Sequence, residues 1–194
     1  MRQTKPIKLT PRKFEDLSPL KYSLATCPTI TWRNWEQMKC LVTAFQGECG
    51  RGVDGDGGDY AGFMSVIIKA AIEAWDPVAL ILDLRELKYE WGDELTLPLH
   101  APFFDPGKVQ HQSFFGNRPK LAEGGLNGVA NKSLAYPMAV VISDLNRTGL
   151  TSLVKDELSL EESENTINSS DLVATLEDAW ENVDQRLQKI FQKA

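Results

Sequence analysis

The sequence predicts an α/β fold, with a mainly parallel or mixed sheet and helices packed on it. Two short apolar runs, Val78–Leu84 and Met138–Ser143, are typical of strands that are covered on both faces, as in parallel sheets. Between Tyr60 and Trp75, apolar residues recur at helical spacing. A helix that leads through a short turn into a buried strand indicates a βαβ unit. We therefore expect one α/β domain built from such units.

The first residues, 1–29, are expected to form an extended arm, and residues 30–194 to form the single domain. The arm shows little periodicity and is interrupted by Pro6, Pro11, Pro19 and Pro28. Met38–Glu48 alternates between apolar and polar residues and is rich in β-formers, which predicts a strand. Ile30–Trp35 is its expected hairpin partner.

A loop rich in glycine and aspartate, Gly50–Asp59, precedes the predicted helix, with Asp59 at the N-cap position. The apolar face of that helix consists of Tyr60, Phe63, Met64, Ile67, Ile68, Ala71, Ile72 and Trp75. The helix should end at Asp76-Pro77, because proline cannot continue the hydrogen-bond ladder. Asp54-Gly55-Asp56 is similar to the start of a calcium-binding EF-hand loop. The glycine and glutamate that such a loop needs further on are absent, so no metal site is predicted.

The second half of the chain is expected to hold an irregular insertion and two helices. The insertion, residues 95–136, carries Pro98, Pro102, Pro106 and Pro119 with four phenylalanines, which indicate that it packs against the domain. Asn146–Asp156 is predicted to form a short helix and Glu161–Ser170 a polar break. The final helix is predicted at Asp171–Phe191, with Ser170 as its cap.

Composition excludes several classes of function. The 194 residues include 21 Lys and Arg against 27 Asp and Glu, a net charge of −6, which opposes nucleic-acid binding. The longest apolar runs have five residues, too short to span a membrane. Cys27, Cys40 and Cys49 match no metal or redox spacing, and we expect a cytoplasmic protein with structural thiols and no cofactor. The basic arm and the acidic segment 155–184 are either solvated surfaces or partners in a contact within or between chains.

The candidate binding site follows from the topology, because sites in open α/β sheets form beyond the carboxyl ends of the strands. After the first buried strand this rule selects Asp83, Arg85, Tyr89, Trp91 and Asp93. After the second it selects Ser143, Asp144, Asn146 and Arg147, which lead into a helix N-terminus. These residues either form local ion pairs and caps or line a crevice for a protein partner or a small anion.

No catalytic residue is predicted. His100 and His111 lie in the irregular insertion without a neighbouring nucleophile, and Ser152 lacks an evident base. No Walker lysine, dinucleotide-binding glycine pattern or zinc-protease motif occurs in the chain.

The chain also resembles the STAS domain, the fold of bacterial anti-sigma-factor antagonists, over about residues 38–190. VALILDLRELKYEWGDEL looks like the strand-then-switch segment of that family, and SSDLVATLEDAWENV looks like its final helix. The resemblance implies a non-enzymatic regulatory protein that binds a protein partner. Where the family has a phosphorylatable serine, this chain has Gly92-Asp93-Glu94, so the implied relatives are unphosphorylated scaffolds or sensors.

Two other functions remain as alternatives. The order of elements is similar to a crotonase or Clp-protease core, which would imply a hydrolase or an acyl-transfer enzyme. The acidic surface would also suit an immunity-like inhibitor of a toxin. A homo-oligomer is compatible with each of these functions.

Overall fold

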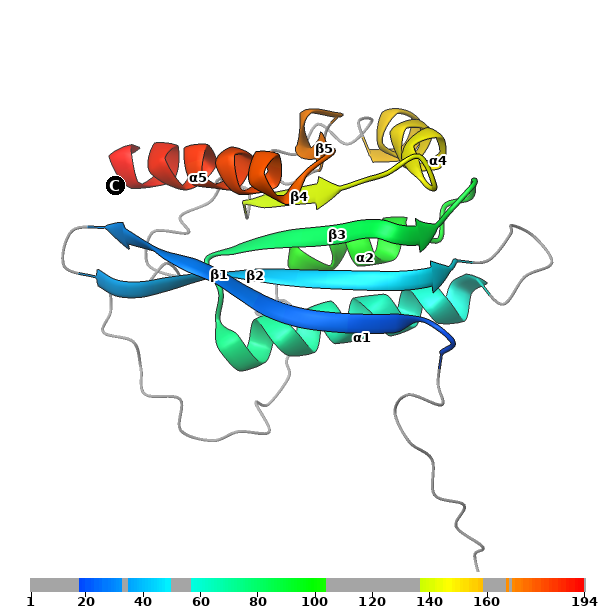
Figure 1. Ribbon diagram of the computed structural model, residues 1–194, viewed down its shortest axis with the longest axis horizontal. Coiled ribbons are helices and arrows are strands. Elements are labelled where there is room, and N and C mark those ends of the chain that lie inside the picture. Colours follow the sequence, from blue (N-terminus) through cyan, green and yellow to red (C-terminus); the bar gives the residue numbers. More distant parts are fainter. Residues whose placement is uncertain are drawn as a thin grey trace, which may run out of the picture.

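The computed structural model describes residues 18–32, 35–49, 57–103, 137–158, 167 and 169–193. They form a mixed five-stranded sheet in the order β1-β2-β3-β4-β5 (Figure 1). The strands are β1 (Lys21–Trp32), β2 (Trp35–Glu48), β3 (Ala79–Lys88), β4 (Met138–Val141) and β5 (Leu172–Val173). β1 is antiparallel to β2, and β2 to β5 are parallel to one another. The predicted α/β class is confirmed.

Helices cover both faces of the sheet. On one face lie α1 (Gly57–Trp75), α2 (Thr96–His100) and the 3-10 turn η3 (Ala101–Phe103). The other face carries α5 (Leu176–Lys193), which packs on β3 and β4. α4 (Arg147–Leu153) follows β4 and continues as the π-helical turn η4 (Val154–Leu158); the 3-10 turn η5 (Ser169–Asp171) precedes β5. No described helix is both long and apolar enough to cross a bilayer.

The two predicted apolar strands are adjacent and parallel, as expected. Leu80 lies opposite Met138, and Asp83 lies opposite Val141. Alternate residues of β3 face opposite sides, since Leu80 belongs to the core under α1 whereas Ile81 belongs to the core under α5. β4 and residues 79–82 of β3 are buried on both sides, which explains their uninterrupted apolar sequences.

The sheet begins earlier than predicted. β1 starts at Lys21, so residues 21–29, which we assigned to the arm, are a strand paired with β2. Because of Pro28, the sequence pattern did not predict this strand. β1 is an edge strand with a register shift between Cys27 and Ile30, and proline is tolerated at such positions. The predicted hairpin partner Ile30–Trp35 is only partly correct, because Ile30 and Trp32 belong to β1 and pair with β2, but Trp35 is the first residue of β2 itself and lies opposite Trp32. Residues 1–17 lie outside the described part of the chain.

Other predicted boundaries also shift. α1 begins at Gly57, so Asp59 lies inside the helix and is not its N-cap. α5 begins at Leu176, and Thr175 caps it in place of Ser170, because the Thr175 hydroxyl oxygen accepts a 3.0 Å hydrogen bond from the Asp178 backbone N–H. The predicted helix Asn146–Asp156 is present as α4 and η4.

The predicted insertion is helical at its start, where α2 and η3 occupy residues 96–103. The rest of the insertion, residues 104–136, lies outside the described residues, as do residues 50–56 of the Gly/Asp loop and most of the polar break at 161–170. The predictions for those segments therefore stay predictions.

Candidate functional site

A β-bulge near the end of β3 shapes the first part of the candidate site. Ala44 of β2 lies opposite Asp83, but Gln46 lies opposite Glu86, so β3 holds one extra residue between these pairs. Leu84 and Leu87 remain fully buried on the α1 side despite their odd spacing. The bulge therefore places Asp83, Arg85 and Glu86 close together at the surface, an arrangement that bulges commonly create beside functional sites.

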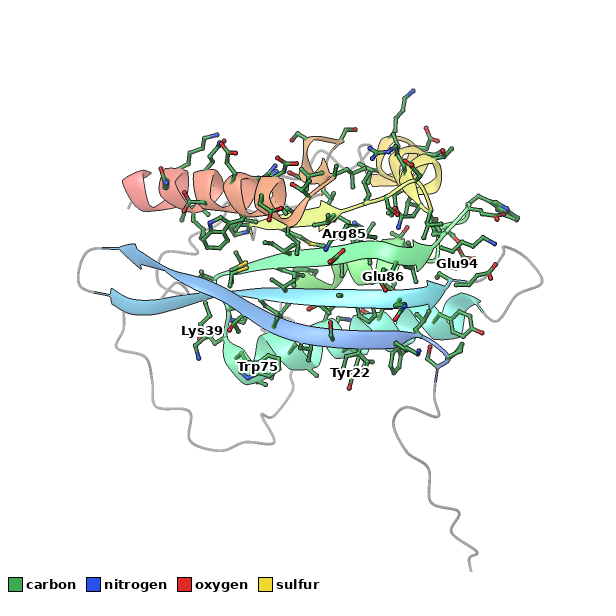
Figure 2. All side chains as sticks on the ribbon, in the orientation of Figure 1. Tyr22, Lys39, Trp75, Arg85, Glu86 and Glu94 are labelled. Atoms are coloured by element: carbon green, nitrogen blue, oxygen red, sulfur yellow. The ribbon has the colours of Figure 1, made fainter. Side chains whose placement is uncertain are left out.

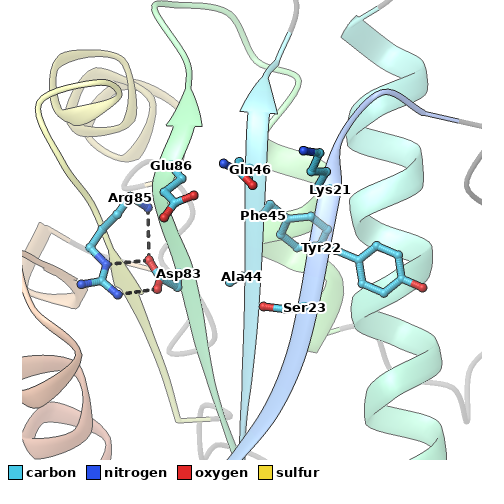
Figure 3. A pocket seen from close by; sticks show the side chains of 9 residues that line it. All are labelled: Lys21, Tyr22, Ser23, Ala44, Phe45, Gln46, Asp83, Arg85 and Glu86. Carbon is cyan, nitrogen blue, oxygen red and sulfur yellow. Dashed lines mark hydrogen bonds and ion pairs between the residues drawn. The ribbon is translucent and has the colours of Figure 1, made fainter.

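These residues line a pocket of about 300 Å³ (Figure 3). The pocket lies on the face of the sheet that carries α5. Asp83 is two residues after Ile81 and therefore points to the same face of β3, and Ile81 packs under α5. Its polar lining side chains are Lys21, Ser23, Gln46, Asp83, Arg85 and Glu86, from three neighbouring strands. The pocket is thus a polar depression over β1, β2 and β3.

Asp83 and Arg85 form a two-point ion pair inside this pocket. Arg85 donates from Nε to Asp83 Oδ1 at 2.9 Å and from Nη2 to Oδ2 at 2.7 Å. These hydrogen bonds are the main cause that raises the pKa of Arg85, and the charge of Glu177 at the start of α5 adds to it. The side chain of Arg85 is 41% exposed and that of Asp83 is 13% exposed. The carboxylate of Asp83 therefore already balances the positive charge of Arg85.

A buried set of hydrogen bonds joins the ends of β3 and β4. The Ser143 hydroxyl donates to the carbonyl of Arg85 at 2.7 Å. The side-chain amide of Asn146 donates to the carbonyls of Leu87, at 2.8 Å, and Leu84. The backbone N–H of Tyr89 donates to the carbonyl of Leu145 at 3.2 Å. These hydrogen bonds therefore fix the segment after β4 to the end of β3 and to the loop that follows β3.

The second part of the site is a pocket of about 270 Å³ between the loop after β3 and α4. Its lining includes Glu90, Trp91, Gly92, Gly149, Ser152 and Asp156. The loop lies directly on α4, because a Cβ at Gly149 would come within 2.7 Å of the carbonyl oxygen of Glu90. The Trp91 side chain is 54% exposed at this pocket.

The predicted site residues do not all line one pocket. Asp83 and Arg85 line the first pocket, and Trp91 lines the second. The polar groups of Tyr89, Ser143 and Asn146 form hydrogen bonds with backbone groups of β3 and of the loops at the strand ends. The remaining predicted residues are exposed and line neither pocket: Asp93, Asp144 and Arg147.

The N-terminus of α4, where the sequence predicts a possible anion contact, has no side-chain cap. Asn146 stands at its N-cap position, but its amide is directed into the backbone of β3 and makes no cap hydrogen bond. Arg147 pairs with Asp144 at 3.6 Å across the first turn, with both side chains exposed. The local ion pairs expected at Asp83–Arg85 and Asp144–Arg147 are therefore both present.

Several residues that line the two pockets were not predicted from the sequence. Lys21, Gln46 and Glu86 reach the first pocket through β1 and the β3 bulge, and Glu90 and Asp156 reach the second. A signal for the bulge was present, because Leu84 and Leu87 are three residues apart in a strand whose apolar residues should alternate.

Two side chains that could carry chemistry, Ser152 and His100, lie in the described part of the chain. The Ser152 hydroxyl donates to Asp156 at 2.7 Å, and the Nε2 atom of His100 has no hydrogen-bond partner within the described chain. Nowhere in that same part do three or more His, Cys, Asp or Glu side chains group as a metal site would require. His111 lies outside it.

In comparisons with known proteins, no family model, curated protein or solved structure matches this chain.

Proposed function

We propose that this chain is a protein-interaction module of STAS-like type, which binds a protein partner at the carboxyl ends of its parallel strands without catalysing a reaction. One observation carries the proposal. Trp91 and Leu145 expose 54% and 52% of their surfaces on two loops that meet at this end of the sheet. Exposed tryptophan is typical of the centres of protein interfaces.

The fixed backbone around these side chains supports the proposal. The hydrogen bond from Tyr89 to Leu145 and the bonds of Ser143 and Asn146 hold both loops in one arrangement. A surface that is ordered before it binds loses less conformational entropy on association. The bonds of Ser143 and Asn146 are better suited to this positioning role than to chemistry.

The order of elements supports the STAS-like type. The strand β2, the helix α1, the parallel strands β3 and β4, the short helix α4 and the closing helix α5 occur in the order of the segments that carry the resemblance, with α2 between β3 and β4 and β5 before α5. A small anion is a weaker candidate occupant, because Arg85 and Arg147 are each paired with a carboxylate of the chain itself.

The experiment compares partner capture by the full chain and by two surface variants. We expect Trp91→Ala and Leu145→Ser to remove the captured partner in a native pull-down. Trp75→Ala and Val66→Ser are matched controls, because these residues of α1 expose 43% and 52% of their surfaces. Trp75 lies far from the carboxyl ends of the parallel strands (Figure 2). Each variant should melt at the wild-type temperature. If capture survives the first pair as it survives the controls, the proposal is wrong.

A further inference from the structure

Two of the three cysteines face each other across the hairpin of β1 and β2. Cys27 of β1 lies directly opposite Cys40 of β2 in the antiparallel register. Side chains of directly opposite residues project from the same face of a sheet. Both thiols accordingly belong to the core under α5, and both are free. Their spacing matches no sequence motif, because the register of the hairpin, and not a fixed number of residues, brings them together.

The geometry of this pair suits a disulfide. Directly opposite residues of antiparallel strands have Cα atoms about 4.5–5.5 Å apart, and disulfides connect Cα atoms about 4.4–6.8 Å apart. The thiols also contact each other. Burial raises the pKa of both, and a hydrogen bond between them offsets part of this rise at Cys27, whereas the neighbouring Cys27 adds to the rise at Cys40. A bond could therefore form without a change in the register of the strands.

The three thiols differ in their access to solvent and to one another. Cys27 is half-buried, whereas Cys40 is only 1% exposed. An oxidant in solution therefore reaches the sulfur of Cys27 first. Cys49 is buried in the core under α1, so the sheet separates it from the other two cysteines. Of the three pairings within one chain, the structure thus permits Cys27 with Cys40.

The pair lies where the regular pairing of the edge strand ends. β1 has β2 as its only neighbour in the described sheet, and its register shifts between Cys27 and Ile30. A covalent bond here would hold β1 to the sheet at the point where backbone pairing becomes irregular. Cys40 lies opposite Ala79, the first residue of β3, so the pair is at the amino ends of the parallel strands. The surface of the proposed function lies at their carboxyl ends.

We propose that Cys27 and Cys40 form a reversible disulfide that fixes β1 to the sheet when a small-molecule disulfide, such as oxidised glutathione, is in excess. The Cys27 thiolate attacks the small disulfide, forms a mixed disulfide and displaces one small thiolate. The Cys40 sulfur then attacks the Cys27 sulfur and displaces the second. The protein thiols lose two electrons and two protons, and the oxidant gains them as two small thiols. This inference does not depend on the proposed function.

The first test identifies the bonded cysteines by peptide mass spectrometry. The full chain is equilibrated in buffers with different ratios of reduced to oxidised glutathione, and free thiols are then alkylated after denaturation. Equilibrium is approached from both sides, with reduced protein and with protein that was oxidised in urea and refolded. We expect the Cys27–Cys40 bond in excess oxidised glutathione and its loss in excess reduced glutathione, with Cys49 alkylated throughout.

Three results would overturn the inference. The first is a pair that stays free, or stops at the mixed disulfide, from both starting points. The second is a bond that involves Cys49 or that forms only between two chains. The third is a Cys27–Cys40 bond that persists in excess reduced glutathione, because the bond would then be permanent and not reversible.

The second test measures what the bond does to the hairpin. Oxidation should raise the melting temperature by about 5–10 °C, because closing the loop from residue 27 to residue 40 restricts the unfolded chain. Backbone amides of residues 24–27 should also exchange more slowly with deuterium. Cys49→Ser is the matched control and should keep both effects, whereas Cys27→Ser should lose both. Equal melting temperatures of oxidised and reduced wild type, or the same shift in Cys27→Ser, contradict the inference.

Discussion

The side-chain amide of Asn146 donates a 2.8 Å hydrogen bond to the carbonyl of Leu87, although the two residues lie on different strand ends. The same amide also donates to Leu84, and its oxygen accepts from the backbone N–H of Ser143 at 3.1 Å. Asn146 is only 1% exposed. One buried side chain thus forms hydrogen bonds with backbone groups of β3 and of the segment after β4.

Asn146→Ala should lower the free energy of unfolding by about 2–3 kcal/mol. The substitution leaves buried carbonyl groups of Leu84 and Leu87 without donors, and each unsatisfied group costs about 1–3 kcal/mol. Urea denaturation measures the loss. Asn182→Ala is the control, because the Asn182 amide makes one bond, to the exposed residue Ser170 at 2.9 Å. A loss no greater than that of the control would show that the Asn146 bonds do not hold the loops.

Gly149→Ala should destabilise the chain, whereas Gly62→Ala should stabilise it. A Cβ at position 149 would lie 2.7 Å from the carbonyl oxygen of Glu90 and 2.9 Å from the Tyr89 ring, so the loop after β3 must move. A Cβ at position 62 meets nothing within 4 Å. Alanine is favoured over glycine in a helix by about 1 kcal/mol, and this gain should appear at position 62.

Thermal unfolding of the two alanine variants gives opposite shifts of the melting temperature if the close approach is real. The indole N–H signal of Trp91 in NMR spectra should also move in Gly149→Ala and stay in place in Gly62→Ala, since only the first contacts its loop. Equal stabilities would mean that α4 and the loop are not packed as described.

The sequence predicted the buried elements well because their patterns are strong. β4 and the first four residues of β3, 79–82, are apolar at every position, and α1 carries a complete apolar face. β5 could not be predicted, because two residues are too short for a strand pattern. Leu172 looked like part of the last helix, yet it pairs with Val140 and packs on the core under α1.

The sequence could predict site residues only at the carboxyl ends of the parallel strands, where the topology of the sheet selects them. The rule for the ends of parallel strands selected Arg85, Trp91 and Asn146, and all three lie at that edge. It could not separate Trp91, which is exposed, from Asn146, which is buried in backbone contacts. Trp91 follows the bulge in β3, which shifts the direction of the side chains beyond it, whereas the Asn146 amide is directed to the backbone carbonyls of β3.

The stability of the chain should fall as the pH rises above about 9, partly because of Cys40. Burial raises the pKa of its thiol above the ordinary value of 9.0, and repulsion from the facing Cys27 raises it further. The folded state therefore keeps the proton after the unfolded chain has lost it. This contribution is fully present below the unfolded pKa and is lost as the pH rises through and beyond it.

Denaturation curves at several pH values measure this effect. Between about pH 8 and pH 10 the wild type should lose about 1 kcal/mol more than Cys40→Ala, since one pKa unit corresponds to about 1.4 kcal/mol. Between pH 6 and pH 8 the two proteins should change in parallel, which serves as the internal control. Parallel behaviour above pH 9 as well would show that the Cys40 thiol is not desolvated.

Arg186→Ala should destabilise the chain by about 3 kcal/mol, because it leaves a buried charge without its counter-charge. Asp171 is fully buried just before β5, and Arg186 of α5 forms an ion pair with it. Arg186 also donates to the carbonyl of Met138 at 3.4 Å, so it joins α5 to β4. Lys189→Ala, on the exposed side of α5, should change the stability by less than about 0.5 kcal/mol. Equal effects of both substitutions in urea denaturation would mean that this ion pair does not hold α5 on the sheet.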